Sequence, residues 1–150
     1  MTKVLLRIIA SLLLLFNGIG TLYGGGNLIL HPDGSSLQLS LDWLQHTSFQ
    51  NYLIPGIILF VANGLFSIIV CIAVFLRYRN SALLVMMQGV ILMGWILIQV
   101  KLRQTIYFLH VILGSVGLAL LVIGYLLKVG TNRDQVKPLE VDGGIKLSDL

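Results

Sequence analysis

Four long apolar segments are the feature that most limits what this chain can fold into. They cover residues 4–23, 53–76, 81–100 and 105–127, and none of them contains an aspartate or a glutamate. Crossing a hydrocarbon core of about 30 Å takes about 20 helical residues. Because lipid offers the backbone no hydrogen bonds, such segments are expected to be helices. The sequence therefore predicts four transmembrane helices.

The composition agrees with a membrane protein. The 150 residues are 57% hydrophobic and 11% charged, whereas globular proteins carry about 25% charged residues. A core built by a chain of this size cannot bury so much apolar surface, so lipid has to cover the rest. The net charge of +4 does not indicate nucleic-acid binding, because the basic residues are scattered around the apolar segments and form no stripe.

The links and the basic residues predict how the helices are arranged. Residues 77–80 and 101–104 form short links, which make the helices that they join antiparallel neighbours. Cytoplasmic loops carry an excess of lysine and arginine. With both termini in the cytoplasm, only Lys101 and Arg103 lie outside. The basic residues that then lie inside are Lys3, Arg7, Arg77, Arg79, Lys128, Arg133, Lys137 and Lys146. This distribution predicts a multi-pass membrane protein with both ends cytoplasmic.

The two ends of the chain have different expected roles. Residues 1–16 have a basic start and an apolar middle, as signal peptides do, but no A-x-A cleavage pattern follows them. The first apolar segment is also long enough to span, so we expect it to remain as the first helix. Residues 129–150 are polar and contain glycine and proline. They are expected to form a flexible cytoplasmic tail after a transmembrane domain of residues 1–128.

The loop between the first two segments, residues 24–52, contains no lysine or arginine and has a pattern of its own. The sequence HPDG at 31–34 is a turn signal, because proline sets φ at the first central position and Asp and Gly suit the positions after it. Leucines precede this turn, and beyond it leucines alternate with polar residues over 36–41. A period of two predicts strands. We therefore expect a short β-hairpin lying on the helix ends.

A short interfacial helix is predicted after the hairpin, over residues 41–49. Ser40 can cap its first turn, and Asp42 lies where the helix dipole favours a negative charge. The aromatic residues Trp43, Phe49 and Tyr52 suit the membrane interface. The expected fold class is thus an all-α membrane protein, an antiparallel four-transmembrane-helix bundle with an outer β-hairpin and interfacial helix between its first two helices.

A belt of uncharged polar residues lies inside the predicted membrane helices, one in each helix and each beside a glycine. Its members are Asn17, Asn63, Gln88 and Ser115. They can hold the helices together through hydrogen bonds, worth about 0.6 to 2 kcal/mol each. They can equally line a polar cavity for a ligand or a permeating solute. Glycines in the first and fourth segments also predict packing surfaces, within the chain or between copies in a homo-oligomer.

A second set of candidate site residues gathers at the outer face in this topology. Its members are His31, Asp33, Asp42, His46, Lys101, Arg103, Tyr107 and His110. One interpretation pairs Lys101 and Arg103 with the two aspartates, which would orient the loop; exposed pairs contribute about 0 to 1 kcal/mol. A second is that the basic residues attract an anionic lipid headgroup or solute. A third is that the histidines bind a metal or a quinone-like cofactor.

Patterns for catalysis and for resident cofactors are missing from the sequence. It contains no G-x-S-x-G, HExxH or phosphate-loop pattern. His31 and His46 lack the short spacing typical of metal ligands. The single cysteine, Cys71, lies in an apolar run and is expected to pack as a small apolar side chain. We therefore expect no metal, no other cofactor and no enzymatic activity.

The order of the helices and three stretches of the sequence resemble small bacterial inner-membrane proteins of the DoxX-like kind. The stretches are FNGIG (16–20), YLIPGIILFVANGLF (52–66) and GWILIQV (94–100). The resemblance implies a location in a bacterial inner membrane and a role as a redox accessory subunit. DoxX-like proteins often have an acidic residue near the second helix, where this chain has Asn63.

Three functions are compatible with the sequence. The first is a non-enzymatic membrane protein whose bundle and outer cap bind a partner protein or lipid. The second is a carrier or binding protein for a small or lipophilic solute, which uses the polar belt. The third is the DoxX-like redox accessory subunit.

Overall fold

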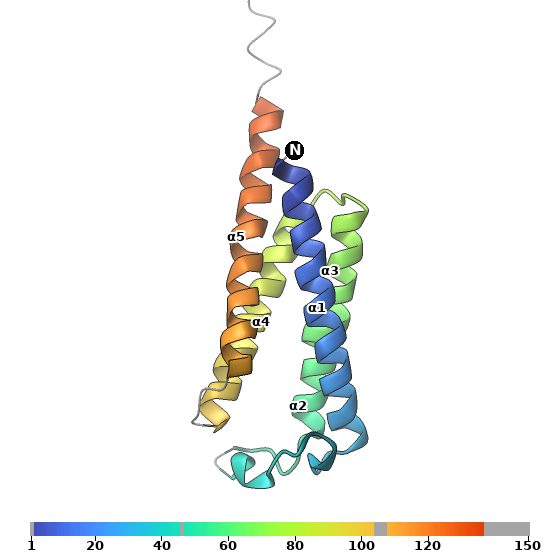
Figure 1. Ribbon diagram of the computed structural model, residues 1–150, viewed down its shortest axis with the longest axis vertical. Coiled ribbons are helices and arrows are strands. Elements are labelled where there is room, and N and C mark those ends of the chain that lie inside the picture. Colours follow the sequence, from blue (N-terminus) through green and yellow to red (C-terminus); the bar gives the residue numbers. More distant parts are fainter. Residues whose placement is uncertain (1, 46, 104–107, 137–150) are drawn as a thin grey trace, which may run out of the picture.

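The computed structural model describes residues 2–45, 47–103 and 108–136, and this part of the chain is helical and contains no strand. Helix α1 covers Thr2–Leu30. The next crossing is one continuous helix made of α2 (Leu53–Ile58), a π-helical stretch η3 (Leu59–Leu65) and α3 (Phe66–Phe75). Helix α4 covers Ser81–Arg103 and α5 covers Phe108–Val136. Figure 1 shows these crossings running side by side along the long axis of the molecule.

Within the described ranges, four helices are long and apolar enough to cross a membrane. The qualifying spans are Lys3–Leu30, Leu53–Phe75, Ser81–Lys101 and Phe108–Gly130. Helix α1 and helix α5 both extend beyond the spans expected from hydrophobicity. The predicted flexible tail begins as helix, since α5 continues to Val136, and residues 137–150 lie outside the described residues.

The helices associate as two closely packed pairs. In the first pair, α1 lies along the α2–η3–α3 crossing, and a Cβ added at Gly25 would lie 2.7 Å from the backbone nitrogen of Phe60. In the second pair, α4 lies along α5, and a Cβ added at Gly89 would lie 2.8 Å from the carbonyl oxygen of Gly117. Only glycine permits backbones to approach so closely. The glycines of the helices are thus used for packing within the chain at these positions.

The two pairs join through a buried core in the half of the molecule that contains the N-terminus. This core includes Ala10 and Leu14 of α1, Val70 of α3, Leu92 of α4 and Leu120 of α5. At the end of the molecule, Lys3 Nζ donates a 2.9 Å hydrogen bond to the carbonyl oxygen of Gly130. Toward the opposite end, α1 and α2 lie apart from α4 and α5 (Figure 1).

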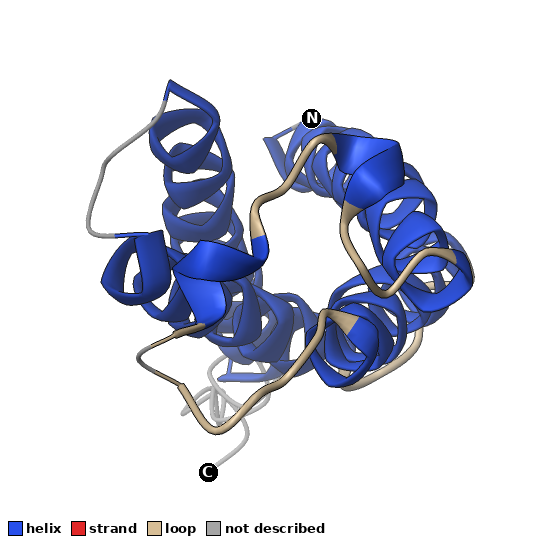
Figure 2. Cartoon of the chain, turned by 90° about the horizontal axis from the view of Figure 1, so that it is seen from below, coloured by secondary structure: helices blue, strands red, loops and turns tan. Residues whose placement is uncertain are grey.

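Residues 31–45 and 47–52 form a cap across that opposite end (Figures 1 and 2). The predicted β-hairpin is wrong, because the described residues of the cap contain two 3₁₀ turns, η1 (Ser35–Leu37) and η2 (Leu41–Leu44), and no strand. The backbone nitrogen of His31 donates to the carbonyl oxygen of Asn27 at 2.8 Å. Leu28–Leu30 therefore complete the last turn of α1, and the first strand of the hairpin does not exist.

The second predicted strand is interrupted by the backbone of two residues. Gly34 has φ 79° and Gln38 has φ 53°, and both are left-handed conformations that an extended strand excludes. A 3.0 Å bond from the nitrogen of Leu39 to the oxygen of Gly34 closes the compact turn. Leu37 and Leu39 still pack inward, against a buried cluster that includes Leu28 and Leu44.

The predicted interfacial helix is shorter than expected. Its start is as predicted, since the Ser40 hydroxyl accepts a bond from the nitrogen of Asp42. It ends at Leu44, where Thr47 Oγ1 donates to the Leu44 carbonyl and accepts from the nitrogen of Phe49. A hydroxyl that bonds the local backbone in this way competes with further helical turns.

Candidate functional site

A cavity of about 490 Å³ lies beneath the cap, between the two helix pairs. Its walls come from five parts of the chain: α1, the cap, the start of the second crossing, α4 and the first turns of α5. The cap contributes Leu37, Leu39, Trp43, Leu44 and Tyr52. The cavity therefore exists because the helix pairs separate at this end and the cap covers the space that they leave.

The walls are mainly apolar, with a small number of polar side chains. These polar residues include Asn17 and Thr21 of α1, Trp95 and Gln99 of α4, and His110 of α5. Among the described residues that line the cavity there is no aspartate, glutamate, lysine or arginine. Small-molecule sites commonly have this character, an apolar surface with a few polar groups that fix orientation.

Asn17 connects the cavity wall to a polar network between the helices. Its amide nitrogen donates to Ser67 Oγ at 2.7 Å and to the carbonyl oxygen of Asn63 at 3.3 Å. Gln88 Nε2 donates to Asn63 Oδ1 at 3.4 Å. Three members of the predicted polar belt are thus buried and linked across α1, η3 and α4. Asn17 alone among them lines the cavity.

The fourth member of the predicted belt lies elsewhere. Ser115 is exposed, and its hydroxyl donates to the carbonyl oxygen of Val111, one turn earlier in its own helix, at 2.7 Å. Hydroxyls in apolar helices are commonly satisfied in this way. Ser115 therefore neither joins the network nor lines the cavity.

The π-helical stretch η3 places Asn63 in the middle of this network. A π turn shifts backbone bonds from the i−4 to the i−5 carbonyl, and such turns occur often at functional sites. Close contact with α1 accompanies it, because a Cβ at Gly64 would lie 2.7 Å from Leu22 Cδ2. The irregular stretch thus coincides with the point where α1, η3 and α4 exchange polar contacts.

Several buried polar atoms around the cavity and the network have no hydrogen-bond partner within the described structure. They are Asn17 Oδ1, Asn63 Nδ2, Gln88 Oε1 and Trp95 Nε1, together with an Arg7 nitrogen near the other end. A buried polar atom without a partner costs about 1–3 kcal/mol. Such atoms are rare in folded proteins, and each calls for a physical explanation. Two of these residues, Asn17 and Trp95, line the cavity.

The predicted outer-face cluster is divided between the cap surface and the cavity. His31, Asp33, Asp42 and Lys101 are exposed, whereas His110 is buried and lines the cavity. His46, Tyr107 and the side chain of Arg103 lie outside the described residues. The hydrogen bonds of the two aspartates stay within the cap: Asp33 accepts from Ser35, and Asp42 accepts from Ser40 and Gln45. The described residues contain no ion pair from Lys101 to either aspartate.

The Asp33 carboxylate is held by its local turn. Ser35 donates to Asp33 Oδ1 through its hydroxyl at 2.8 Å and through its backbone nitrogen at 3.2 Å. Because both bonds favour the ionised form, they lower the pKa of Asp33 below its ordinary value. The aspartate therefore works as a turn-forming residue of the cap.

The role of Trp95 in the cavity could not be read from the sequence. Trp95 lies in an apolar helix, where a tryptophan is expected to pack in the core or to face lipid, and Thr21 lies among the glycines of α1 without a pattern of its own. Both reach the cavity because the helix pairs separate there. One feature of the sequence could have indicated a ligand site here: Trp95 is followed one helical turn later by the amide side chain of Gln99, near the cap end of α4.

The fold and the cavity together define a class: a helical membrane protein with a small-molecule-sized, mainly apolar cavity under a folded cap. No known family model, curated protein or solved structure matches this chain. The DoxX-like resemblance therefore stays a prediction.

Proposed function

We propose that this protein binds a small lipophilic molecule in the cavity beneath the cap. The observation that carries the proposal is the cavity itself, about 490 Å³ with mainly apolar walls. Ligand sites in proteins typically measure about 300–1,000 Å³ and combine apolar walls with a few polar groups. The volume and the lining of this cavity fall within that description.

The lining favours binding over catalysis. General acid–base chemistry uses histidine most often, and also carboxylates and lysines, whereas covalent catalysis needs an activated nucleophile such as a cysteine. The described lining residues include one histidine, His110, but no carboxylate, lysine or cysteine that could act with it, and Cys71 lies elsewhere. Asn17, Thr21, Gln99 and His110 are suited to orient a bound molecule through hydrogen bonds.

The proposed placement in the cell follows from the basic residues. Among the described residues, most lysines and arginines lie at the end of the bundle away from the cap, which is the pattern expected for a cytoplasmic side. Together with the DoxX-like resemblance, this supports the proposal of a bacterial inner-membrane protein whose cap and cavity face the outer side. Binding of a partner protein to the cap stays a prediction, because no described contact favours it over the cavity.

The experiment uses tryptophan fluorescence in lipid nanodiscs. The chain has 2 tryptophans, and Trp43 and Trp95 both line the cavity. A bromoalkane chain quenches tryptophan on contact, so ω-bromoundecanol serves as the probe. Binding in the cavity predicts quenching that saturates, whereas simple partition into lipid gives quenching that rises in proportion to probe concentration.

A matched pair of variants in the cap separates the cavity from its surroundings. Leu37 lines the cavity and Leu41 is exposed and does not. Leu37→Phe is expected to lower the affinity for the probe, measured by saturable quenching, about tenfold, a loss of about 1.4 kcal/mol of binding free energy. Leu41→Phe is expected to leave the affinity unchanged. Quenching without saturation in the parent protein would show that the cavity binds no such molecule.

A further inference from the structure

The cavity has an open side between α1 and α5. Three lining residues are exposed: Phe16 and Gly20 of α1, and Leu109 of α5. Phe16 is 55% exposed and Leu109 is 58% exposed. The other described lining residues are buried or half-buried. The cavity therefore reaches the surface of the bundle at this place.

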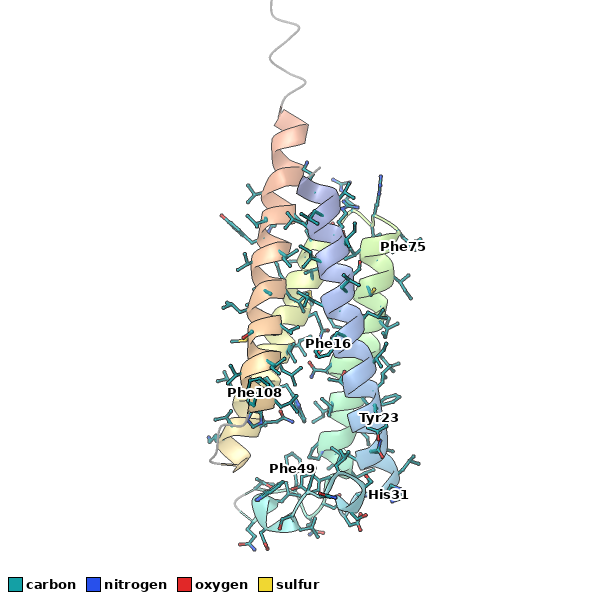
Figure 3. The ribbon with its side chains drawn as sticks, in the orientation of Figure 1. Phe16, Tyr23, His31, Phe49, Phe75 and Phe108 are labelled. Carbon is teal, nitrogen blue, oxygen red and sulfur yellow. The ribbon has the colours of Figure 1, made fainter. Side chains whose placement is uncertain are left out.

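The surroundings of this opening are apolar. Leu12 and Ile19 of α1 and Phe108 of α5 are exposed beside it. Figure 3 labels Phe16 and Phe108, which come from the two helices on either side. These positions belong to spans that are long and apolar enough to cross a membrane. In a bilayer the opening therefore faces lipid chains rather than water.

Gly20 keeps the opening free of side chains. A Cβ added there would meet nothing within 4 Å. Two other glycines of α1 are explained by packing, since a Cβ at Gly18 would lie 2.6 Å from Ile68 Cδ1 and one at Gly25 would lie 2.7 Å from Phe60 N. Packing within the chain does not account for the glycine at position 20. An unobstructed path into the cavity does.

The polar groups of the cavity indicate what the ligand carries. Trp95 is 8% exposed and Asn17 is 1% exposed, and each has one buried atom without a partner, the donor Nε1 and the acceptor Oδ1. A hydroxyl or an amide can both accept from an indole nitrogen and donate to an amide oxygen. A carboxylate or phosphate would enter a site whose described lining offers no lysine or arginine, at a large desolvation cost.

We infer that the ligand is an uncharged amphiphile of the bilayer, with a hydroxyl- or amide-like polar group, and that it enters the cavity sideways between α1 and α5. This inference rests on the proposed function. Trp95 and Asn17 are the residues that select the polar group, and Gly20 provides the passage.

The passage is tested with Gly20→Leu and a matched control, Gly94→Leu. Gly94 is a helical glycine at which an added Cβ also meets nothing within 4 Å, and it does not line the cavity. In nanodiscs, Gly20→Leu is expected to slow the approach of ω-bromoundecanol to saturation at least tenfold. Gly94→Leu is expected to keep the parent rate. The inference is wrong if Gly20→Leu keeps the parent rate while Leu37→Phe in the cap slows it, because the probe would then come from the aqueous side.

The chemistry of the ligand is tested with three probes of equal chain length: ω-bromoundecanol, bromoundecane and ω-bromoundecanoate. In Trp43→Phe, Trp95 is the remaining tryptophan, and we expect the alcohol to bind at least fivefold more tightly than the alkane or the carboxylate. In Trp95→Phe, with emission from Trp43, the preference of the alcohol over the alkane should fall to below twofold. Equal binding of the carboxylate would overturn the assignment of an uncharged ligand.

Failure of this inference and failure of the proposed function give different results. If no probe quenches the parent protein in a saturable way, the cavity is not a binding site and both fail. If quenching saturates but is indifferent to Gly20→Leu and to the polar group, the proposed function stands and the inference does not.

Discussion

The side-chain nitrogen of Asn17 lies 2.7 Å from the hydroxyl oxygen of Ser67, which joins α1 to α3 within the membrane-spanning part of the bundle. The same nitrogen lies 3.3 Å from the carbonyl oxygen of Asn63 in the π-helical stretch. One amide group therefore connects two neighbouring segments of the second crossing to the first helix. The same buried residue also forms part of the cavity wall.

Replacing Asn17 with alanine is expected to destabilise the bundle. The substitution leaves Ser67 without its 2.7 Å donor, and interhelical hydrogen bonds of this kind average about 0.6 kcal/mol with a maximum of about 1.7. Unfolding by SDS titration in mixed micelles should show a loss of about 1 kcal/mol. The matched control is Ser115→Ala, which removes a bond within one helix and should change stability by less than about 0.5 kcal/mol. Equal losses in the two variants would contradict an interhelical role for Asn17.

Replacing Gly25 with valine is expected to separate α1 from the second crossing. A Cβ at this position would lie 2.7 Å from Phe60 N and 2.9 Å from the carbonyl oxygen of Gly56. Backbone atoms cannot move aside as a flexible side chain can, and overpacking costs about 1–3 kcal/mol. Thermal unfolding monitored by circular dichroism measures the loss. Gly20→Val, at a site with open space, is the matched control and should unfold near the parent temperature. An equal fall in both variants would show that the valine side chain itself, and not the contact with Phe60 and Gly56, causes the loss.

Replacing Tyr52 with phenylalanine is expected to loosen the cap. The Tyr52 hydroxyl donates a 2.6 Å bond to the carbonyl oxygen of Ser40, and a bond of this type contributes about 0.5–1.5 kcal/mol. Amide hydrogen exchange of residues 32–45 should rise about threefold to tenfold, while exchange in α4 stays constant. Tyr23→Phe changes an exposed tyrosine and should leave the cap protected. A cap with unchanged exchange in Tyr52→Phe would mean that its apolar cluster alone holds it.

The turn at Asp33 is expected to lose order only in acid. Because the pKa of Asp33 is lowered in the folded cap, ionisation favours the folded turn. This contribution is complete above the ordinary aspartate value of about 3.9 and disappears as the pH falls through the lower folded value. Carbon-detected NMR titration of the Asp33 carboxyl measures this. Ser35→Ala removes the donating hydroxyl and should move the pKa of Asp33 upward; an unchanged pKa would assign the shift to another cause.

The membrane-spanning helices could be predicted because their signal is local. Length and hydrophobicity of a single segment are sufficient for a span, and each of the four apolar segments coincides with a helix that qualifies. The turn at 31–34 was also predictable, and it is closed by a 3.0 Å bond from the nitrogen of Gly34 to the carbonyl oxygen of His31. Ser40 caps a short helical turn as expected.

The hairpin and the cavity depend on contacts that a local pattern does not record. Alternating leucines also fit a compact turn with Gln38 at positive φ, in which Leu37 and Leu39 pack inward without a strand. For the polar belt, the sequence could not tell that Ser115 bonds its own helix while Asn17, Asn63 and Gln88 meet across helices. The cavity arises from the separation of two helix pairs, which is a property of the whole bundle.

The helix pairs pack directly on each other around Ala10, Leu14 and Leu120, far from the cap. Long helices act as stiff rods, so a small change in the crossing angle at that contact becomes a larger displacement at the other end. The width of the cavity is therefore set at a distance, by the size of side chains that never touch its contents. Ala10 is fully buried at this contact. A larger side chain at position 10 would therefore change the size of the ligand that the cavity accepts, without a change to any residue of the cavity wall.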